Sequence, residues 1–124
     1  MKRLSKSEEE LMNFLWQQNT ASLKELLEAY PDPKPAMTTV ATLLKRMTDK
    51  GFIDFVTQGK SRIYRALVKK EAYFGNHLKG LIKNFFNNSN QQFASFFTTE
   101  VDFTEDELKE LRNVINDQIK QRKK

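Results

Sequence analysis

Two stretches of helical periodicity open the chain, and each follows a capping signal. The first apolar stripe consists of Leu11, Met12, Leu15 and Trp16. A capping box of Ser5 and Glu8 precedes it, so the pattern predicts a helix from about residue 5 to 18. Ser22 and Glu25 repeat this signal before a shorter stripe, which "PDPKP" ends because proline supplies no amide hydrogen. The second predicted helix is therefore brief.

A third helical pattern covers about residues 37–50. Its apolar stripe consists of Val40, Leu43, Leu44 and Met47. Gly51 suits the left-handed conformation that commonly ends a helix. At about 100° per residue, polar side chains lie away from this stripe. They are Thr38, Thr42, Lys45 and Asp49, with Thr39 and Arg46 on the flank. Such a face suits a DNA major groove, because threonine bonds phosphates and arginine binds guanine bidentately, but it fits an ordinary solvated helix face equally well.

Alternating aromatic and β-branched residues then predict a β-hairpin over about residues 52–67. The segments "FIDFVTQ" and "SRIYRAL" flank a turn at Gly59-Lys60. Three helices followed by a hairpin describe a winged helix. The wing cations Lys60, Arg62 and, further along, Arg65 are placed to reach phosphates, although charges on edge strands also discourage aggregation.

From residue 69 onward the chain is helical and rich in phenylalanine. The pattern predicts a long helix up to the break at "NNSN", a short apolar piece at "QQFASFF", and a last helix capped by Thr104 and Glu107. A segment this small rarely buries so many phenylalanines alone, so we expect it to pack against a partner chain; the alternative is that it folds back on the first domain. The predicted fold is mainly α with a small β-hairpin. It comprises an N-terminal winged helix-turn-helix over residues 1–68 and a helical dimerisation domain over residues 69–124.

The positive charge of the chain is concentrated in its middle. The 124 residues carry a formal charge of +5, and residues 1–33, 34–70 and 71–124 contribute −2, +7 and 0. A basic middle third is what a phosphate-binding surface requires, although a solvated charged surface has the same composition.

Several function classes have no support in the composition. The chain has no cysteine and a single histidine, His77, so it lacks the residues for a zinc site, a disulfide or a catalytic triad. We therefore expect no metal, no cofactor and no enzymatic activity. No run of about 18 apolar residues and no signal peptide are present, so we expect a cytoplasmic protein that does not contact a membrane.

Several motifs together resemble a known family. The stretches "LSKSEEELMNFLW", "TTVATLLKRMTDKGFI", "GKSRIYRAL" and "DELKELRNVI" are similar to the penicillinase and methicillin-resistance repressors (the BlaI/MecI group) and to the related copper-responsive repressors. The resemblance runs from about Leu4 to Ile119, and the "DKG" that ends the third helix is its most specific part. It implies a homodimeric transcriptional repressor, with a winged helix that binds palindromic operator DNA and a helical domain that dimerises.

The resemblance also assigns roles to individual positions. It makes residues 37–50 the recognition helix and residues 52–67 the wing. The DNA-binding residues would then be Thr38, Thr39, Thr42, Lys45, Arg46, Lys60 and Arg62. The apolar stripes of the predicted tail helices, and not the resemblance, supply the candidate dimerisation residues, which are Leu78, Leu81, Phe85, Leu108, Leu111, Ile115 and Ile119.

Two departures from the family pattern concern the inducing signal. Copper-responsive members carry cysteine motifs near the C-terminus, and the absence of cysteine here counts against copper sensing. Antibiotic-responsive members are inactivated by proteolysis at an Asn-Phe bond in the dimerisation domain, which makes an inactivating protease a candidate partner. The corresponding position here is Phe96-Phe97, so the signal stays open.

Two other function classes remain as alternatives. A winged helix can also serve as a protein-interaction module or as an RNA-binding module without operator specificity. Readers of single-stranded RNA need exposed aromatic side chains for base stacking, and Tyr64 is the main candidate for that role.

Overall fold

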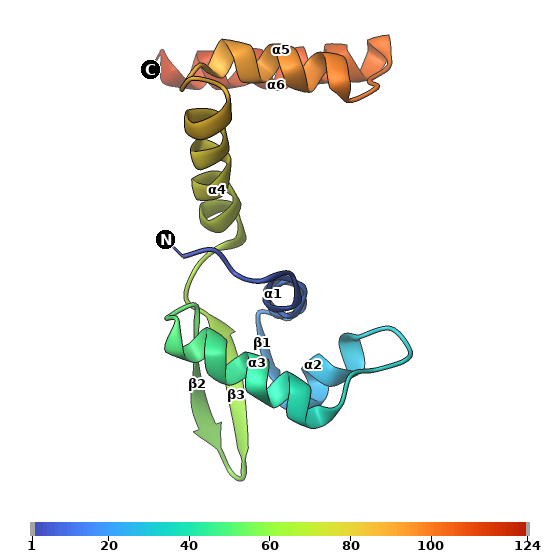
Figure 1. Cartoon of the computed structure of the whole chain (residues 1–124), viewed down its shortest axis with the longest axis vertical. Coiled ribbons are helices and arrows are strands. Elements are labelled where there is room, and N and C mark those ends of the chain that lie inside the picture. The colour runs from blue at the N-terminus through green and yellow to red at the C-terminus, as the bar shows by residue number, and fades with distance from the viewer. Residues whose placement is uncertain (1, 124) are drawn as a thin grey trace. The chain divides into compact units, whose positions relative to one another are not determined.

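The computed structural model describes residues 2–123, which are mainly helical with a small antiparallel sheet, as the sequence predicts (Figure 1). The chain forms two compact units, residues 1–78 and 79–124. The division falls within helix α4 (Lys70–Phe85), rather than at residue 68, where the sequence pattern changes character. The first turns of α4 therefore belong to the same unit as the predicted winged helix.

The first unit has the winged-helix order of elements. Its helices are α1 (Lys6–Gln18), α2 (Leu23–Ala29), α3 (Met37–Asp49) and the start of α4, and its strands are β1 (Thr20–Ser22), β2 (Ile53–Gln58) and β3 (Ser61–Ala66). The sheet order is β1-β3-β2, and both pairs are antiparallel. Tyr64 in the central strand faces Ala21 on one side and Phe55 on the other. The sequence pattern did not predict β1, which has only three residues.

Local hydrogen bonds set the helix ends where the sequence places them. Capping boxes start α1 and α2, and the side chains of Ser5 and Ser22 each accept a hydrogen bond from the third residue of the helix. Gly51, with φ of 82°, ends α3. The amide of Phe52 donates to the Met47 carbonyl at 3.0 Å, and that of Gly51 donates to the Thr48 carbonyl at 3.0 Å. These two bonds satisfy carbonyls that the end of the helix would otherwise leave unpaired.

The core of the first unit joins α1, α2, α3 and the start of α4 to the sheet. Its fully buried side chains include Leu11, Met12, Leu15, Leu26, Val40, Leu44, Met47, Ile53 and Tyr73. Each predicted apolar stripe of the first three helices contributes to this core. Tyr64 is also buried, at 7% exposure, so the prediction that it offers an exposed ring for base stacking is wrong. Its ring packs against that of Phe55 instead.

The second unit has no comparable core. It comprises the end of α4, α5 (Asn90–Glu100) and α6 (Glu105–Arg122). Asn87 and Asn88 adopt positive φ where α4 ends, at the predicted break, and the capping box of Thr104 starts α6. The segment predicted as a short apolar piece is the 11-residue helix α5. No residue from 79 to 123 is buried, and the phenylalanine rings lie in contact with one another but remain at least partly exposed.

Candidate nucleic-acid interface

The outer face of α3 carries the polar side chains that the sequence assigns to it. Thr38, Thr39, Thr42, Lys45 and Arg46 are all exposed. The stripe on the other side of the helix, which includes Val40 and Leu44, is buried. Met37, in the first turn of α3, is 58% exposed, although its spacing from the stripe favours burial. The structure therefore brings the five candidate side chains together on one solvent-exposed face, and their role in binding stays a prediction.

Two side chains of this face, Thr42 and Lys45, make local interactions within α3. The hydroxyl of Thr42 donates to the Thr38 carbonyl at 2.9 Å, and Lys45 forms an ion pair with Asp49 at 3.1 Å. Both partners of the ion pair are well exposed, and an exposed pair one helical turn apart contributes only about 0.3–0.5 kcal/mol. Lys45 can therefore exchange Asp49 for an external anion at little cost.

The hairpin presents two of its three cations to solvent, and neither has an acidic partner among residues 2–123. Gly59, with φ of 64°, forms the turn, and Lys60 and Arg62 follow it. The Arg62 guanidinium lies 4.2 Å from the centre of the Phe55 ring, an arrangement in which the ring attracts the cation and restrains its position. A groove of about 420 Å³ separates α3 from the hairpin, and Lys45, Asp49 and Arg62 are among the residues that line it.

Arg65 differs from the other wing cations. It donates to the two carboxylate oxygens of Asp54 at 2.6 and 3.0 Å, across the β2–β3 pair. The hydrogen bond from Arg65 lowers the pKa of Asp54 below its usual value, and the same bond raises the pKa of Arg65. Sequence reasoning placed Arg65 with the phosphate-binding candidates, whereas its charge is compensated within the sheet.

Other cations of the basic middle segment are also engaged inside the fold. Lys34 donates to the carbonyls of Glu28 and Tyr30 at the end of α2, at 3.0 and 2.6 Å. Lys50 forms an ion pair with Glu8 at 2.7 Å. Within residues 2–123, Arg46, Lys60 and Arg62 take part in no ion pair. Together with Lys45, these three cations give the outer face of α3 and the wing positive charge that a ligand can reach.

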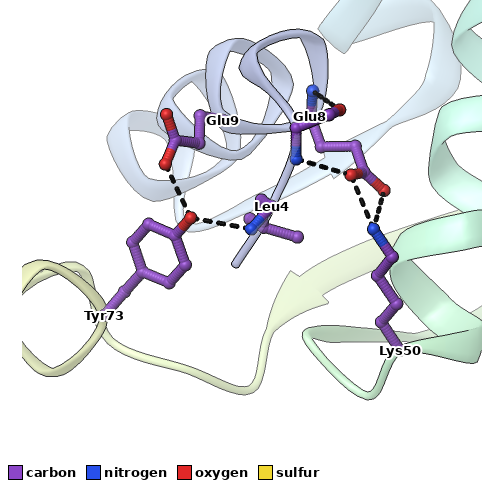
Figure 2. A network of polar contacts seen from close by, with 6 residues as sticks. Leu4, Glu8, Glu9, Lys50 and Tyr73 are labelled. Atoms are coloured by element: carbon purple, nitrogen blue, oxygen red, sulfur yellow. Dashed lines mark hydrogen bonds and ion pairs between the residues drawn. The ribbon is translucent and has the colours of Figure 1, made fainter. Parts of the chain in front are cut away.

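The pairing of Glu8 with Lys50 fixes the end of α3 to α1 (Figure 2). Glu8 is completely buried. Burial alone raises the pKa of its carboxyl, but hydrogen bonds from Lys50 and from the Ser5 backbone outweigh burial, so the pKa lies below its usual value. The sequence identified Glu8 only as part of a capping box. The second role depends on a lysine 42 positions away, which no local pattern indicates.

The candidate dimerisation residues present apolar side chains to solvent on α4 and α6. Leu78, Leu81, Phe85, Leu108, Ile115 and Ile119 are all exposed, and Leu111 is partly buried. Phe85 and Ile115 are the most exposed of them, at 76% and 60%. Phe96 and Phe97 lie within α5 and are also exposed.

The part of the chain that the structure describes offers little to other kinds of site. Over residues 2–123, no three His, Cys, Asp or Glu side chains gather in a way that could hold a metal ion. None of the described helices combines the length and apolar character needed to cross a bilayer.

Comparison with known proteins agrees with this geometry. The family model described as "Penicillinase repressor" matches residues 4–117. The methicillin resistance regulatory protein MecI of Staphylococcus aureus (strain N315) and that of Staphylococcus epidermidis are each 30% identical over 114 residues, which cover 91% of this chain and 93% of theirs. The MecI protein of Mammaliicoccus sciuri is 29% identical over the same length. The chain therefore belongs to the penicillinase repressor family of transcriptional repressors.

Proposed function

We propose that this repressor binds a palindromic operator as a homodimer, with α3 of each protomer in the major groove and the β2–β3 wing on the adjacent backbone. The observation that carries the proposal is the distribution of charge. On the two elements that border one groove, α3 and the hairpin, Arg46, Lys60 and Arg62 are exposed and take part in no ion pair among residues 2–123. Family membership supports the same function.

The two parts of this surface suit different tasks. Thr38, Thr39, Thr42, Lys45 and Arg46 lie on a rigid helix, which is the arrangement that base-edge recognition requires. Lys60 and Arg62 lie beside the Gly59 turn and suit phosphates, which need charge rather than exact geometry. We therefore assign sequence reading to α3 and backbone positioning to the wing.

The apolar surface of α4 and α6 supports the homodimer. Monomeric proteins rarely expose so many large apolar side chains on neighbouring helical turns, and a second copy of the chain would cover them. Two half-sites related by a twofold axis then match two recognition helices about one turn of DNA apart, or a multiple of it. Because the second half-site binds at a high effective concentration, dimerisation also raises affinity.

An inactivating protease is our candidate for the partner that relieves repression. Cleavage within α5 would separate α6 and its apolar stripe from the rest of the protomer, so the dimer would lose part of its interface. The family's Asn-Phe pair is replaced by Phe96-Phe97, so the protease would need a different specificity. A chain cut between these residues should lose operator affinity; a cut chain that still binds fully would exclude this route.

The proposal is tested by selecting bound duplexes from random DNA with the purified protein. We expect enrichment of one inverted repeat, and tighter binding of that repeat than of a scrambled duplex at physiological salt. Single-stranded RNA of the same length serves as a competitor. Equal affinity for every duplex, or preferential binding of the RNA, would favour the interaction or RNA-binding module instead.

A further inference from the structure

A polar clasp connects the start of α4 to α1 inside the first unit. Tyr73, in the first turn of α4, is completely buried. Its hydroxyl accepts a hydrogen bond from the Leu4 amide at 2.9 Å and donates one to a Glu9 carboxylate oxygen at 2.6 Å (Figure 2). Both directional bonds of this hydroxyl thus hold α4 against the N-terminal segment and α1.

Packing around the clasp restrains the same turn of α4. The Tyr73 ring contacts the rings of Trp16 and Phe52, with centroids 6.0 and 5.8 Å away. The indole nitrogen of Trp16 donates to the Val68 carbonyl at 2.9 Å, just before α4 begins. Burial, and to a smaller extent the hydrogen bond to Glu9, raises the pKa of Tyr73 to about 12, so the hydroxyl stays protonated near neutral pH.

The two neighbouring glutamates of α1, Glu8 and Glu9, bind residues of two different helices. Glu8 pairs with Lys50, the residue that caps the end of α3, while Glu9 accepts the hydrogen bond from Tyr73 (Figure 2). One turn of α1 therefore holds the end of the proposed recognition helix and the start of the helix that leads into the second unit.

We infer that Tyr73 is a positioning residue whose hydroxyl fixes the direction in which α4 leaves the winged helix, and so sets the half-site spacing that the dimer accepts. This inference rests on the proposed function. A small change of angle at the start of a long helix displaces its far end. Because α4 has 16 residues and a length of about 24 Å, a tilt of roughly 10° at its start moves its far end by about 4 Å. Apolar packing alone tolerates such tilts, because it has little directional preference.

The test removes only the hydroxyl. Tyr73→Phe keeps the ring in place and deletes both hydrogen bonds. Tyr30→Phe is the matched control, because Tyr30 is also a buried tyrosine, and among the residues that the structure describes its hydroxyl has no partner. Each variant, as the full-length dimer, is titrated against the selected operator, against its half-site, and against operators with one to five base pairs inserted between half-sites.

We expect Tyr73→Phe to retain the half-site affinity of the parent. Its preference for the selected spacing over the altered spacings should fall by about tenfold, the effect of roughly 1.4 kcal/mol of lost restraint. Tyr30→Phe should keep the parental preference. Glu9→Gln should also keep it, because the amide oxygen still accepts the bond from Tyr73. An unchanged spacing preference in Tyr73→Phe, or an equal loss in Tyr30→Phe, would overturn the inference.

A measurement without DNA separates failure of this inference from failure of the proposed function. Amide hydrogen exchange over residues 73–78 reports opening of the first turns of α4 in the full chain. We expect exchange there to be about tenfold faster in Tyr73→Phe than in the parent or in Tyr30→Phe, on the scale of one lost buried hydrogen bond. Unchanged exchange means that the hydroxyl does not restrain α4, whether or not the protein binds an operator.

Discussion

Glu8 illustrates how one buried carboxylate links stability to pH. Its folded-state pKa is lowered, so the ionised form stabilises the fold above the reference value of 4.5, and this contribution is lost as the pH falls through the folded value. We expect the free energy of unfolding of the parent to fall more steeply below pH 4.5 than that of Glu8→Gln, which cannot titrate there. At pH 7 the variant should be less stable by about 1–3 kcal/mol.

Denaturant unfolding across this pH range provides the measurement. Asp54 also has a lowered pKa, but parent and variant share its contribution, so their difference isolates Glu8. Glu10→Gln is the matched control, since Glu10 lies on the same helix and is exposed. If Glu10→Gln and Glu8→Gln changed the pH profile equally, the buried pair with Lys50 would not be its cause.

Sequence reading and backbone binding should separate at single residues. Arg46→Ala and Thr42→Ala should each cost about 1–3 kcal/mol on the operator and relax base preference, because in the proposed complex these side chains contact base edges. Lys60→Ala and Arg62→Ala should weaken operator and scrambled duplex alike, because phosphates carry no sequence. Fluorescence anisotropy with both duplexes measures the difference.

Lys109→Ala, on α6, serves as the charge-matched control for these variants and should leave both affinities unchanged. Circular dichroism should be the same for the parent and all five variants, because every substituted side chain is exposed. Full operator affinity in both α3 variants would show that α3 is not the reading element.

At the scale of elements, two glycines with open surroundings should respond in opposite ways to alanine. Beyond the adjacent residues and the backbone of the same helix, no heavy atom lies within 4 Å of a Cβ added at Gly51 or Gly75, so backbone conformation decides the effect. Gly51 has φ of 82° at the end of α3, so Gly51→Ala should destabilise the protein by about 1–2 kcal/mol. Gly75 lies inside α4, so Gly75→Ala should stabilise it by about 0.5–1 kcal/mol. Thermal unfolding of the two variants gives the sign; the same sign for both would contradict this account of the end of α3.

Local signals in the sequence were sufficient to locate most elements of the first unit and the start of α6 in the second. Capping boxes at Ser5, Ser22 and Thr104 and the glycine at position 51 act within a few residues, so the sequence displays both partners of each interaction. The outward face of α3 followed from periodicity for the same reason. β1 was not predicted because three residues are too few to show an alternating pattern of polar and apolar positions. Its pairing also depends on β3, more than 40 positions away.

The features that sequence reasoning missed depend on contacts between distant residues. Tyr73 lies in the segment that the sequence predicts as a long helix, and nothing near it in the sequence indicates its hydrogen bonds to Leu4 and Glu9. Arg65 was grouped with the wing cations, because the register that places it beside Asp54 is a property of the folded hairpin. The number of charged residues can be counted from the sequence, but which of them are paired with an opposite charge can be seen only in the folded structure.

At the scale of the whole molecule, operator binding should depend strongly on salt. Each protomer offers Arg46, Lys60 and Arg62, with Lys45 available at little cost, so a dimer should release several counterions from DNA. At about 0.9 per neutralised phosphate, we expect a log-log slope of roughly −4 to −8. Affinity measurements between about 50 and 200 mM salt, the range in which such slopes are usually determined, give the slope. A slope near zero would show that these cations do not bind phosphates.

The apolar surface of the second unit should be the dimer interface. Ile115 is 60% exposed in the protomer, so Ile115→Lys should leave the protomer folded while placing an unpaired charge between chains, at a cost of several kcal/mol. Leu111 is partly buried within its own protomer and is therefore a less clean site for this test. Asn113→Lys adds the same charge on the opposite side of α6 and should remain dimeric by sedimentation.

The central claim, a dimer that reads two half-sites, is tested most directly by titrating the parent and Ile115→Lys against full and half operators. We expect the parent to bind the full operator orders of magnitude more tightly than the half-site, because its second winged helix binds at high effective concentration. Ile115→Lys should bind both duplexes with the weak half-site affinity. A monomeric Ile115→Lys that binds the full operator as tightly as the parent, or a parent that does not distinguish the two duplexes, would contradict the account.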